Sequence, residues 1–213
     1  MTKSFFLFGL LLLSSGCISL FPPLPPRPQN VPLDLTFQKL PEVKAVNWSL
    51  AVEKPQASPV LDSKRMIVHL NGPQEVSDLQ PLEGIEWSDR LSTLMQQKMI
   101  SAFEYSDKIM AIGHIDEDFQ ADYALQLDIK KAEIDLTSEN HRAHFEVSAK
   151  LIRQQDRQIV ARKTFHQRQD VTSSSQKDFV QAYGHALENI ISEITVWTLK
   201  TGVEIPKEEK KLL

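Results

Sequence analysis

The sequence predicts an α+β fold: a single domain in which a mostly antiparallel sheet carries two helices packed on one face. Two observations predict this class. Apolar and polar residues alternate through the middle of the chain, as is typical of strands, and two stretches with helical spacing lie before and after them. The predicted order is β-β-α-β-β-β-β-α, and the folded part, residues 47–201, has the length of one domain.

Two strands are predicted ahead of the first helix. Trp48, Leu50 and Val52 alternate with polar residues, which indicates a half-buried strand, and residues 66–70 indicate a second one. We expect a loop over residues 71–82.

The first helix is predicted to begin at Ser88. Serine is a typical N-cap, and Asp89 would then lie in the first turn, where a negative charge is favourable. Apolar residues at helical spacing follow over 91–103. We therefore expect one face of this helix to be buried.

A short strand is expected over 108–112, and three longer strands follow it. In the first of these, apolar residues take odd positions over 123–129 but even positions at Ile134 and Leu136. Because side chains alternate between the faces of a strand, this change of phase predicts a β-bulge or a bend over 130–133.

The next two long strands are predicted over 143–151 and 159–165. A polar turn at 154–157 separates them. We expect the three long strands to pair as two antiparallel hairpins.

The last helix is predicted from a capping-box pattern that runs from Ser175 to Asp178. Apolar residues at helical spacing continue from there to Trp197, and Gly202 is expected to end the helix. Residues 202–213 form a charged tail.

The N-terminus predicts a lipoprotein signal peptide over residues 1–16. Lys3 precedes a nine-residue apolar stretch that ends at Leu13, too short to cross a bilayer as a permanent helix. Cys17, the only cysteine, comes directly after it, and we interpret the preceding residues as a lipobox in spite of a serine where leucine is more common. The lipobox residues are Ser14, Ser15 and Gly16.

Cys17 is therefore the expected site of lipid attachment. The alternatives are a buried cysteine in the core or a thiol that is removed with the signal sequence. One acyl chain gives only marginal membrane binding, so two or three chains on Cys17 would be needed for stable anchoring.

Residues 17–46 are expected to form a lipid-anchored, proline-rich linker. Five of the eight residues over 21–28 are prolines. Such a segment favours polyproline II, a semi-rigid spacer that would hold the domain away from the membrane surface.

Composition excludes several classes of function. The chain has 24 Lys and Arg against 28 Asp and Glu, and it has no basic stripe of the kind that binds nucleic acid. With Cys17 acylated, no thiol remains for a disulfide or a thiolate metal site. No other apolar run reaches the length of a membrane span.

Motifs for catalysis and cofactor binding are absent from the sequence. There is no glycine-rich phosphate loop, no G-x-S-x-G elbow and no H-E-x-x-H helix, so we expect no catalytic residue and no cofactor. His141 and His144 lie three residues apart, which places them on opposite faces of a strand, and we expect no metal site there. We interpret residues 116–118 beside His114 as a solvated acidic loop without the glycine and glutamate of an EF-hand.

Three further residues are weighed for a general acid or base. His185 lies on the last predicted helix, and we expect it at the boundary between the buried and exposed faces of that helix. Asp62 resembles a turn-former. Asp170 has no partner that the sequence identifies. A hydrolase would need a pocket that joins Asp62, His69 or His185 to a nucleophile.

Each of the three tryptophans lies at the edge of a predicted element. Core packing is the default expectation for Trp48, Trp87 and Trp197, and contact with a protein partner is the alternative. Trp87 is the best candidate for partner contact because its neighbours are polar.

The order of several short segments resembles the ABC-type transport auxiliary lipoproteins, the group that includes the Pqi-type lipoprotein of Mce-linked transport systems. The segments are residues 49–52, 60–66, Trp87, residues 121–125 and the closing helix that ends in Trp197.

The resemblance implies a non-enzymatic lipoprotein that works with an inner-membrane ATPase, a permease and an Mce-domain protein. The system would move lipids or other hydrophobic molecules between membranes, and members of the group form homo-oligomeric rings. Ile18 follows the anchor in place of aspartate, which by enterobacterial sorting logic favours the outer membrane, facing the periplasm. The alternative is an envelope assembly cofactor that regulates a cell-wall enzyme or a secretion machine.

Overall fold

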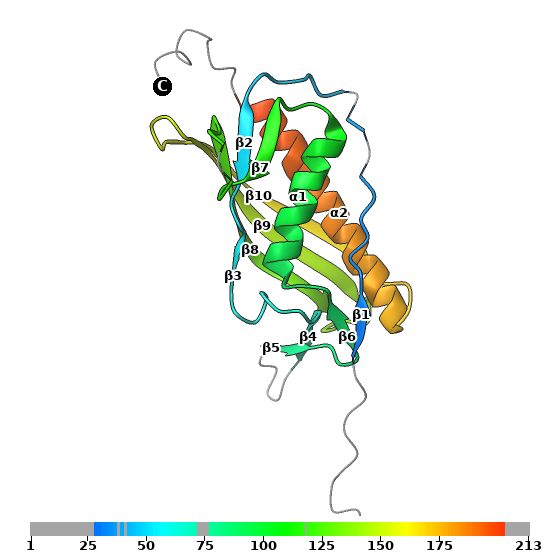
Figure 1. Cartoon of the computed structure of the whole chain (residues 1–213). Coiled ribbons are helices and arrows are strands. Elements are labelled where there is room, and N and C mark those ends of the chain that lie inside the picture. The colour runs from blue at the N-terminus through cyan, green and yellow to red at the C-terminus, as the bar shows by residue number, and fades with distance from the viewer. Residues whose placement is uncertain (1–27, 38, 41, 72–76, 118, 203–213) are drawn as a thin grey trace, which may run out of the picture.

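The computed structural model describes residues 28–37, 39–40, 42–71, 77–117 and 119–202 (Figure 1). The two helices of this part are α1 (Leu91–Ser106) and α2 (Gln176–Thr201). Its short strands are β1 (Gln29–Val31), β2 (Ser49–Val52), β3 (Gln56–Ala57), β4 (Ile67–Asn71), β5 (Ser77–Pro81), β6 (Ile85–Trp87) and β7 (Ala111–His114). Its long strands are β8 (Tyr123–Asp135), β9 (Arg142–Arg153) and β10 (Ile159–Asp170).

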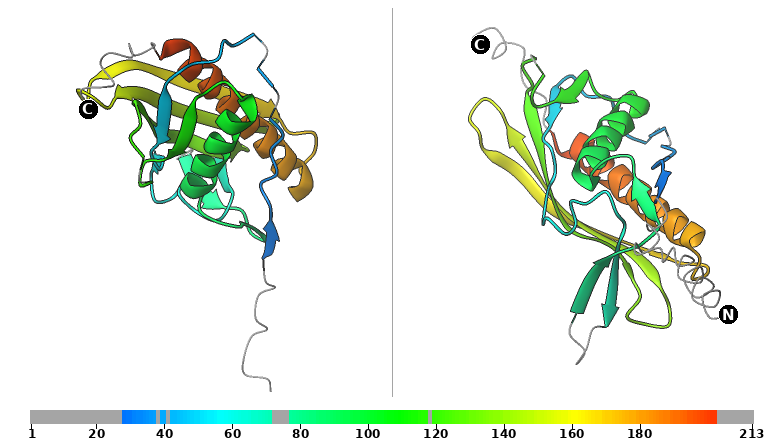
Figure 2. Two further views of the ribbon diagram at one scale, coloured as in Figure 1. Left: turned by 45° about the horizontal axis from the view of Figure 1, so that its top comes forward. Right: turned by 60° about the horizontal axis from the view of Figure 1, so that its bottom comes forward.

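The long strands pair as the two expected antiparallel hairpins, in the order β10-β9-β8. The turn between β9 and β10 lies at the predicted place, and there Arg157 has a φ of 59°. Both helices lie on one side of this sheet (Figure 2), which confirms the predicted α+β fold.

The predicted bulge is present in β8. Its register with β9 shifts between Ile129 and Lys131, leaving Lys130 as the extra residue. The bulge lets Leu127 and Ile134 face the same buried side although their numbers differ in parity.

Short strands complete the sheet beside β8, and most of them are parallel to it. β2, β3 and β4 pair with successive segments of β8, and β7 adds to the far side of β2. All four residues of β2 are buried, and the strand lies between β7 and β8. The expectation of a half-buried strand was therefore wrong: the residues that alternate with Leu50 and Val52 are the small Ser49 and Ala51, and the Ser49 hydroxyl donates to the Asp122 carboxylate at 3.0 Å. β7 also begins at Ala111, three residues after the start expected from the sequence.

The predicted loop over 71–82 was wrong in part. Within that range, β5 pairs with β4 in an antiparallel hairpin. β6 lies just after the range and pairs in parallel with β1. β5 contains few strand-forming side chains, and its backbone pairing with β4 supplies the order that side-chain propensity does not predict.

The predicted start of α1 was also wrong. The helix begins at Leu91, Arg90 occupies the N-cap position without a side-chain cap, and Ser88 and Asp89 lie outside it. The cap comes from Asp62, whose Oδ1 accepts a hydrogen bond of 3.1 Å from the Ser92 amide.

The capping pattern of α2 is confirmed. Ser175 is the N-cap, and its Oγ accepts a hydrogen bond from the Asp178 amide. Gly202 is the C-cap, as expected, and it lies directly against the indole of Trp48.

Part of the expected linker packs against the domain. Over 29–46 the chain contains β1, and Leu33 and Val43 are buried in the core. The Thr36 amide donates a hydrogen bond of 3.2 Å to Glu188 of α2. Figure 1 shows the described parts of this segment running alongside the helices, and we call residues 29–37, 39–40 and 42–46 the strap.

Candidate functional site

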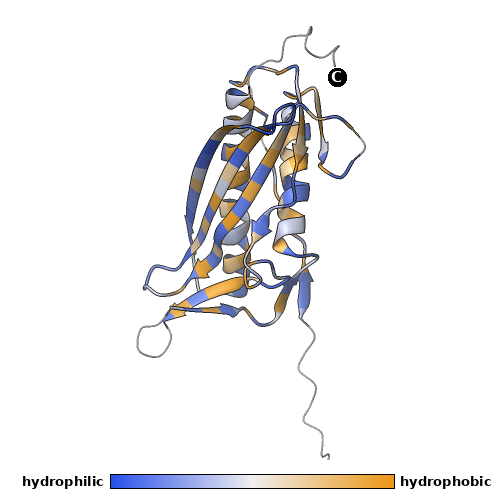
Figure 3. Ribbon diagram, turned by 90° about the vertical axis from the view of Figure 1, so that its left-hand side faces the viewer, coloured by the Kyte–Doolittle hydropathy of each residue, from blue (hydrophilic) through white to orange (hydrophobic). Residues whose placement is uncertain are grey.

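The face of the sheet that points away from the helices carries most of the ionisable side chains of the long strands. Phe145 packs against Tyr183 of α2, with ring centroids 4.6 Å apart, so its neighbours in β9 point to the opposite side. We call that side the outer face. Figure 3 shows the resulting alternation of hydrophilic and hydrophobic residues along the strands.

Register sets which side chains are neighbours on the outer face. Residues paired across strands share a face, and the pairing gives two rows that cross the sheet. The first row is Glu133 in β8, His144 in β9 and Arg168 in β10. The second row is Lys131, Glu146 and His166 on the same three strands.

Glu133 is the most deeply buried carboxylate of the outer face, only 4% exposed. Its Oε1 lies 3.4 Å from Nδ1 of His69 on β4, and Asp135 Oδ1 lies 3.9 Å from the same nitrogen. Burial raises the pKa of Glu133, and the nearby His69 and Lys131 offset only part of that increase.

His69 also contacts a serine. Ser77 Oγ on β5 lies 2.8 Å from Nε2 of the same ring, so serine, histidine and Glu133 follow one another as in a nucleophile relay. Ser77 is exposed, and neither of the two open pockets described below is lined by these residues. We interpret the contacts as a link that holds the β4-β5 hairpin against β8.

His144 is 7% exposed, and its imidazole makes no hydrogen bond with the residues that the structure describes. Burial lowers the pKa of His144, and the positive charges of Lys131 and Arg168 lower it further. The neutral imidazole is therefore the dominant form at neutral pH.

His144 lies close to two other potential ligands. His144, Glu146 and His166 each offer an atom, and these atoms all lie within 4.8 Å of one another. His166 Nδ1 is 3.7 Å from Glu146 Oε2. These three residues come from two strands, and the register between the strands decides that they meet.

His141 does not join that group. It lies just before β9, where its ring is 6.4 Å from that of Phe179 and its Nδ1 is 3.5 Å from Ser174 Oγ. Asp170, weighed above as an acid or base, forms an ion pair with Arg142 at 2.7 Å.

Other candidate residues have structural positions. Trp87 is 1% exposed and packs 5.3 Å from Tyr183 between ring centroids, so the prediction of partner contact was wrong and core packing is correct. His185 is exposed on α2, and Asp116 and Glu117 are exposed after β7. The lipobox and Cys17 lie outside the described residues.

Two open pockets of about 440 Å³ lie at the N-terminal end of α2. One is formed by residues 139–142 and 170–174, and the other includes Arg65, Glu86 and Gln176. Both combine acidic and basic side chains, and Arg65 and Glu86 form an ion pair at 3.3 Å. Neither pocket is lined by charges of only one sign, which is what would select an ionic ligand.

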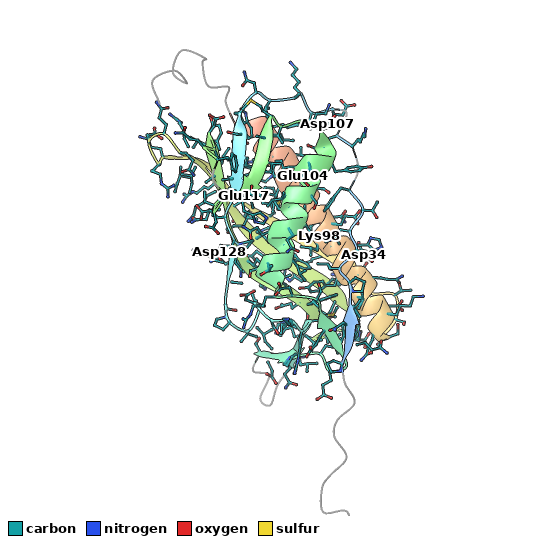
Figure 4. All side chains as sticks on the ribbon, viewed as in Figure 1. Asp34, Lys98, Glu104, Asp107, Glu117 and Asp128 are labelled. Carbon is teal, nitrogen blue, oxygen red and sulfur yellow. The ribbon has the colours of Figure 1, made fainter. Side chains whose placement is uncertain are left out.

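Several acidic side chains outside these rows are dispersed. Figure 4 shows Asp34, Glu104, Asp107, Glu117 and Asp128 spread along the molecule; Glu104 and Asp107 both lie at the end of α1, and the others come from separate segments. No acidic pocket follows from this arrangement. None of the described helices is long and apolar enough to cross a membrane.

The family model for the ABC-type transport auxiliary lipoprotein component matches residues 36–195. The match covers most of the chain, and the chain therefore belongs to this family. The resemblance inferred from the sequence is confirmed. Membrane association is a property of such a lipoprotein family.

One curated protein is also similar to this chain. An uncharacterized protein of Bradyrhizobium diazoefficiens is 28% identical over 173 residues, which are 80% of this chain and 45% of that protein. The chain thus spans about half the length of this curated relative.

Solved structures support the fold. Protein XCC0632 from Xanthomonas campestris superposes with a TM-score of 0.75 at 28% identity, over 86% of this chain and 99% of that one. A second, uncharacterized protein has a TM-score of 0.58 at 11% identity, over 78% of this chain and 97% of that chain, and it shows likeness of fold alone.

Proposed function

We propose that this protein is an outer-membrane lipoprotein of an Mce/Pqi-type ABC transport system that moves lipids or other hydrophobic molecules between membranes. The family match over residues 36–195 carries the proposal. The protein would act without catalysis, with ATP hydrolysis and membrane passage belonging to a separate ATPase and permease.

The anchor is the first element of this function. Cys17 directly follows Ser14, Ser15 and Gly16, and its acylation would attach the chain to the membrane. Ile18 in place of aspartate supports delivery to the outer membrane, with the domain facing the periplasm.

The domain is the second element, and it supplies binding surfaces for partners. The two sides of the sheet are chemically different. On the helix side the strap packs against the apolar core, whereas the outer face carries rows of charged side chains. Strand β10 lies at an end of the described sheet order, an edge where a second copy of the chain could add in a homo-oligomeric ring.

Anchoring is tested with Cys17→Ser. We expect a folded protein that keeps its signal peptide or is mislocalised. The reason is that serine cannot carry the acyl chains, and the cleavage that follows acylation would not occur. Membrane fractionation and the intact mass of the purified protein measure this. An unchanged mature mass with unchanged fractionation would contradict the anchor.

The transport role is tested by purification from native envelopes in mild detergent. We expect an Mce-domain protein to co-purify with the wild-type chain and not with Cys17→Ser. Recovery of the wild-type protein as a lone monomer would argue against membership in such a system while leaving the anchor intact.

A further inference from the structure

We propose that His144, Glu146 and His166 form a binding site on the outer face for a divalent transition-metal ion of the Zn²⁺ class. Their candidate ligand atoms lie within 4.8 Å of one another. Two imidazoles and one carboxylate are a ligand set that suits Zn²⁺ and its first-row neighbours, whereas Mg²⁺ and Ca²⁺ prefer oxygen alone.

Strand pairing holds the three ligands in place. His144 and Glu146 are two residues apart in β9 and so project from the same face, and His166 is the register partner of Glu146 in β10. All three therefore come from one hairpin, in the half far from its turn, where the pairing of the two strands continues to Arg142 and Asp170.

Small side-chain rotations would complete the coordination. Bonds of about 2.0–2.2 Å to Zn²⁺ require the ligand atoms to be somewhat closer than they are in the free protein. The side chains of His166 and Glu146 are 58% and 27% exposed, so they have room to rotate toward His144. Their exposure also leaves coordination positions open to water or to another ligand.

The surrounding charges permit a divalent cation. Lys131 and Arg168 flank the site and oppose a cation, while Glu133 and Asp135 lie on the same face of β8 and favour one. Arg142 lies two residues before His144 on this face and forms an ion pair with Asp170 at 2.7 Å. Counted with Glu146, four carboxylates therefore surround the site against three basic side chains.

The test is calorimetric titration of ZnCl₂ into the full chain, purified in detergent with an affinity tag that lacks histidine. Every variant carries Cys17→Ser, which removes the single thiol as a competing ligand. We expect one Zn²⁺ to bind per chain. We expect H166Q and E146Q each to raise the dissociation constant at least tenfold, with MgCl₂ giving no binding.

His185→Gln is the matched control, because His185 is also exposed but lies on α2, on the other side of the sheet. It should leave the affinity unchanged. Circular dichroism checks the fold of each variant, and Zn²⁺ should raise the melting temperature of the parent chain but not of H166Q. Equal affinity in the parent and H166Q, or no saturable binding in the parent, would overturn the site.

Discussion

At the scale of single residues, the cap of α1 comes from a distant side chain. Asp62 and Ser92 are 30 positions apart, yet the Asp62 carboxylate accepts a hydrogen bond from the Ser92 amide. The side chain of Arg90, at the N-cap position, accepts none. The Arg90 guanidinium donates to the Asp62 carbonyl at 3.0 Å, which ties the same loop to the helix start. The loop ahead of β4 is thereby joined to α1.

Asp62→Ala should lower the free energy of unfolding by about 0.5–2 kcal/mol, the usual contribution of a side-chain N-cap. Asp62→Asn retains an oxygen acceptor and should recover most of that stability. Urea denaturation of both variants measures the difference. Asp89→Ala is the control, because Asp89 lies outside the helix. An equal loss in Asp89→Ala would remove the special role of Asp62.

At the scale of elements, the ends of α2 and β2 meet. Gly202 ends α2 against the indole of Trp48, which precedes β2 and also packs edge-on against Tyr123, 5.1 Å away between ring centroids. A Cβ at Gly202 would lie 2.3 Å from an indole carbon. Gly184, in the middle of α2, has open space around it.

The two glycines give opposite predictions for the same substitution. Gly202→Ala should destabilise the protein by about 1–3 kcal/mol, because a buried ring must move. Gly184→Ala should stabilise it by about 0.5–1 kcal/mol, because alanine favours the helix and meets no neighbour. Urea denaturation of the two variants distinguishes them, and a change of the same sign in both would contradict this packing.

Elements with strong periodicity could be predicted from the sequence, and elements ordered by their neighbours could not. The long strands, the bulge at Lys130 and the Ser175 cap follow from local pattern. β1 and β5 are ordered through backbone pairing with β6 and β4, for which their own residues give little signal.

The metal-ligand group was missed because of one irregularity. The register between β9 and β10 shifts between Ile159 and Ala161, so Val160 is an extra residue. Without that shift, the turn at 154–157 would place Phe165 opposite Glu146 and His166 on the buried side. The apolar Phe165 in a polar strand is the one signal from which the correct face could have been inferred.

At the scale of the whole molecule, the core and the outer face differ in what they tolerate. Aromatic and aliphatic side chains fill the space between the sheet and the helices. The outer face instead buries Glu133 among charged and polar neighbours, which are His69, Lys131, Asp135 and His144. This carboxylate gives the stability of the fold a dependence on pH.

Because burial raises the pKa of Glu133 in the folded protein, its contribution to stability decreases as pH rises from the ordinary value of 4.5 through the raised value. Glu133→Gln removes this ionisation, so its stability relative to wild type should increase as pH rises above 4.5. Urea denaturation across that range measures it. A relative stability that falls with pH would show that the link to His69 outweighs burial.

The strap limits how far the domain can lie from its membrane. Eleven residues lie between Cys17 and Gln29, where β1 begins, and the twelve Cα–Cα steps from one to the other span about 43 Å at most. A linker that continued to Asn47 would allow about 100 Å. With Cys17 acylated, the distance between the domain and its membrane would therefore be short. A component that bridges the periplasm would have to come close to the anchoring membrane to contact the domain.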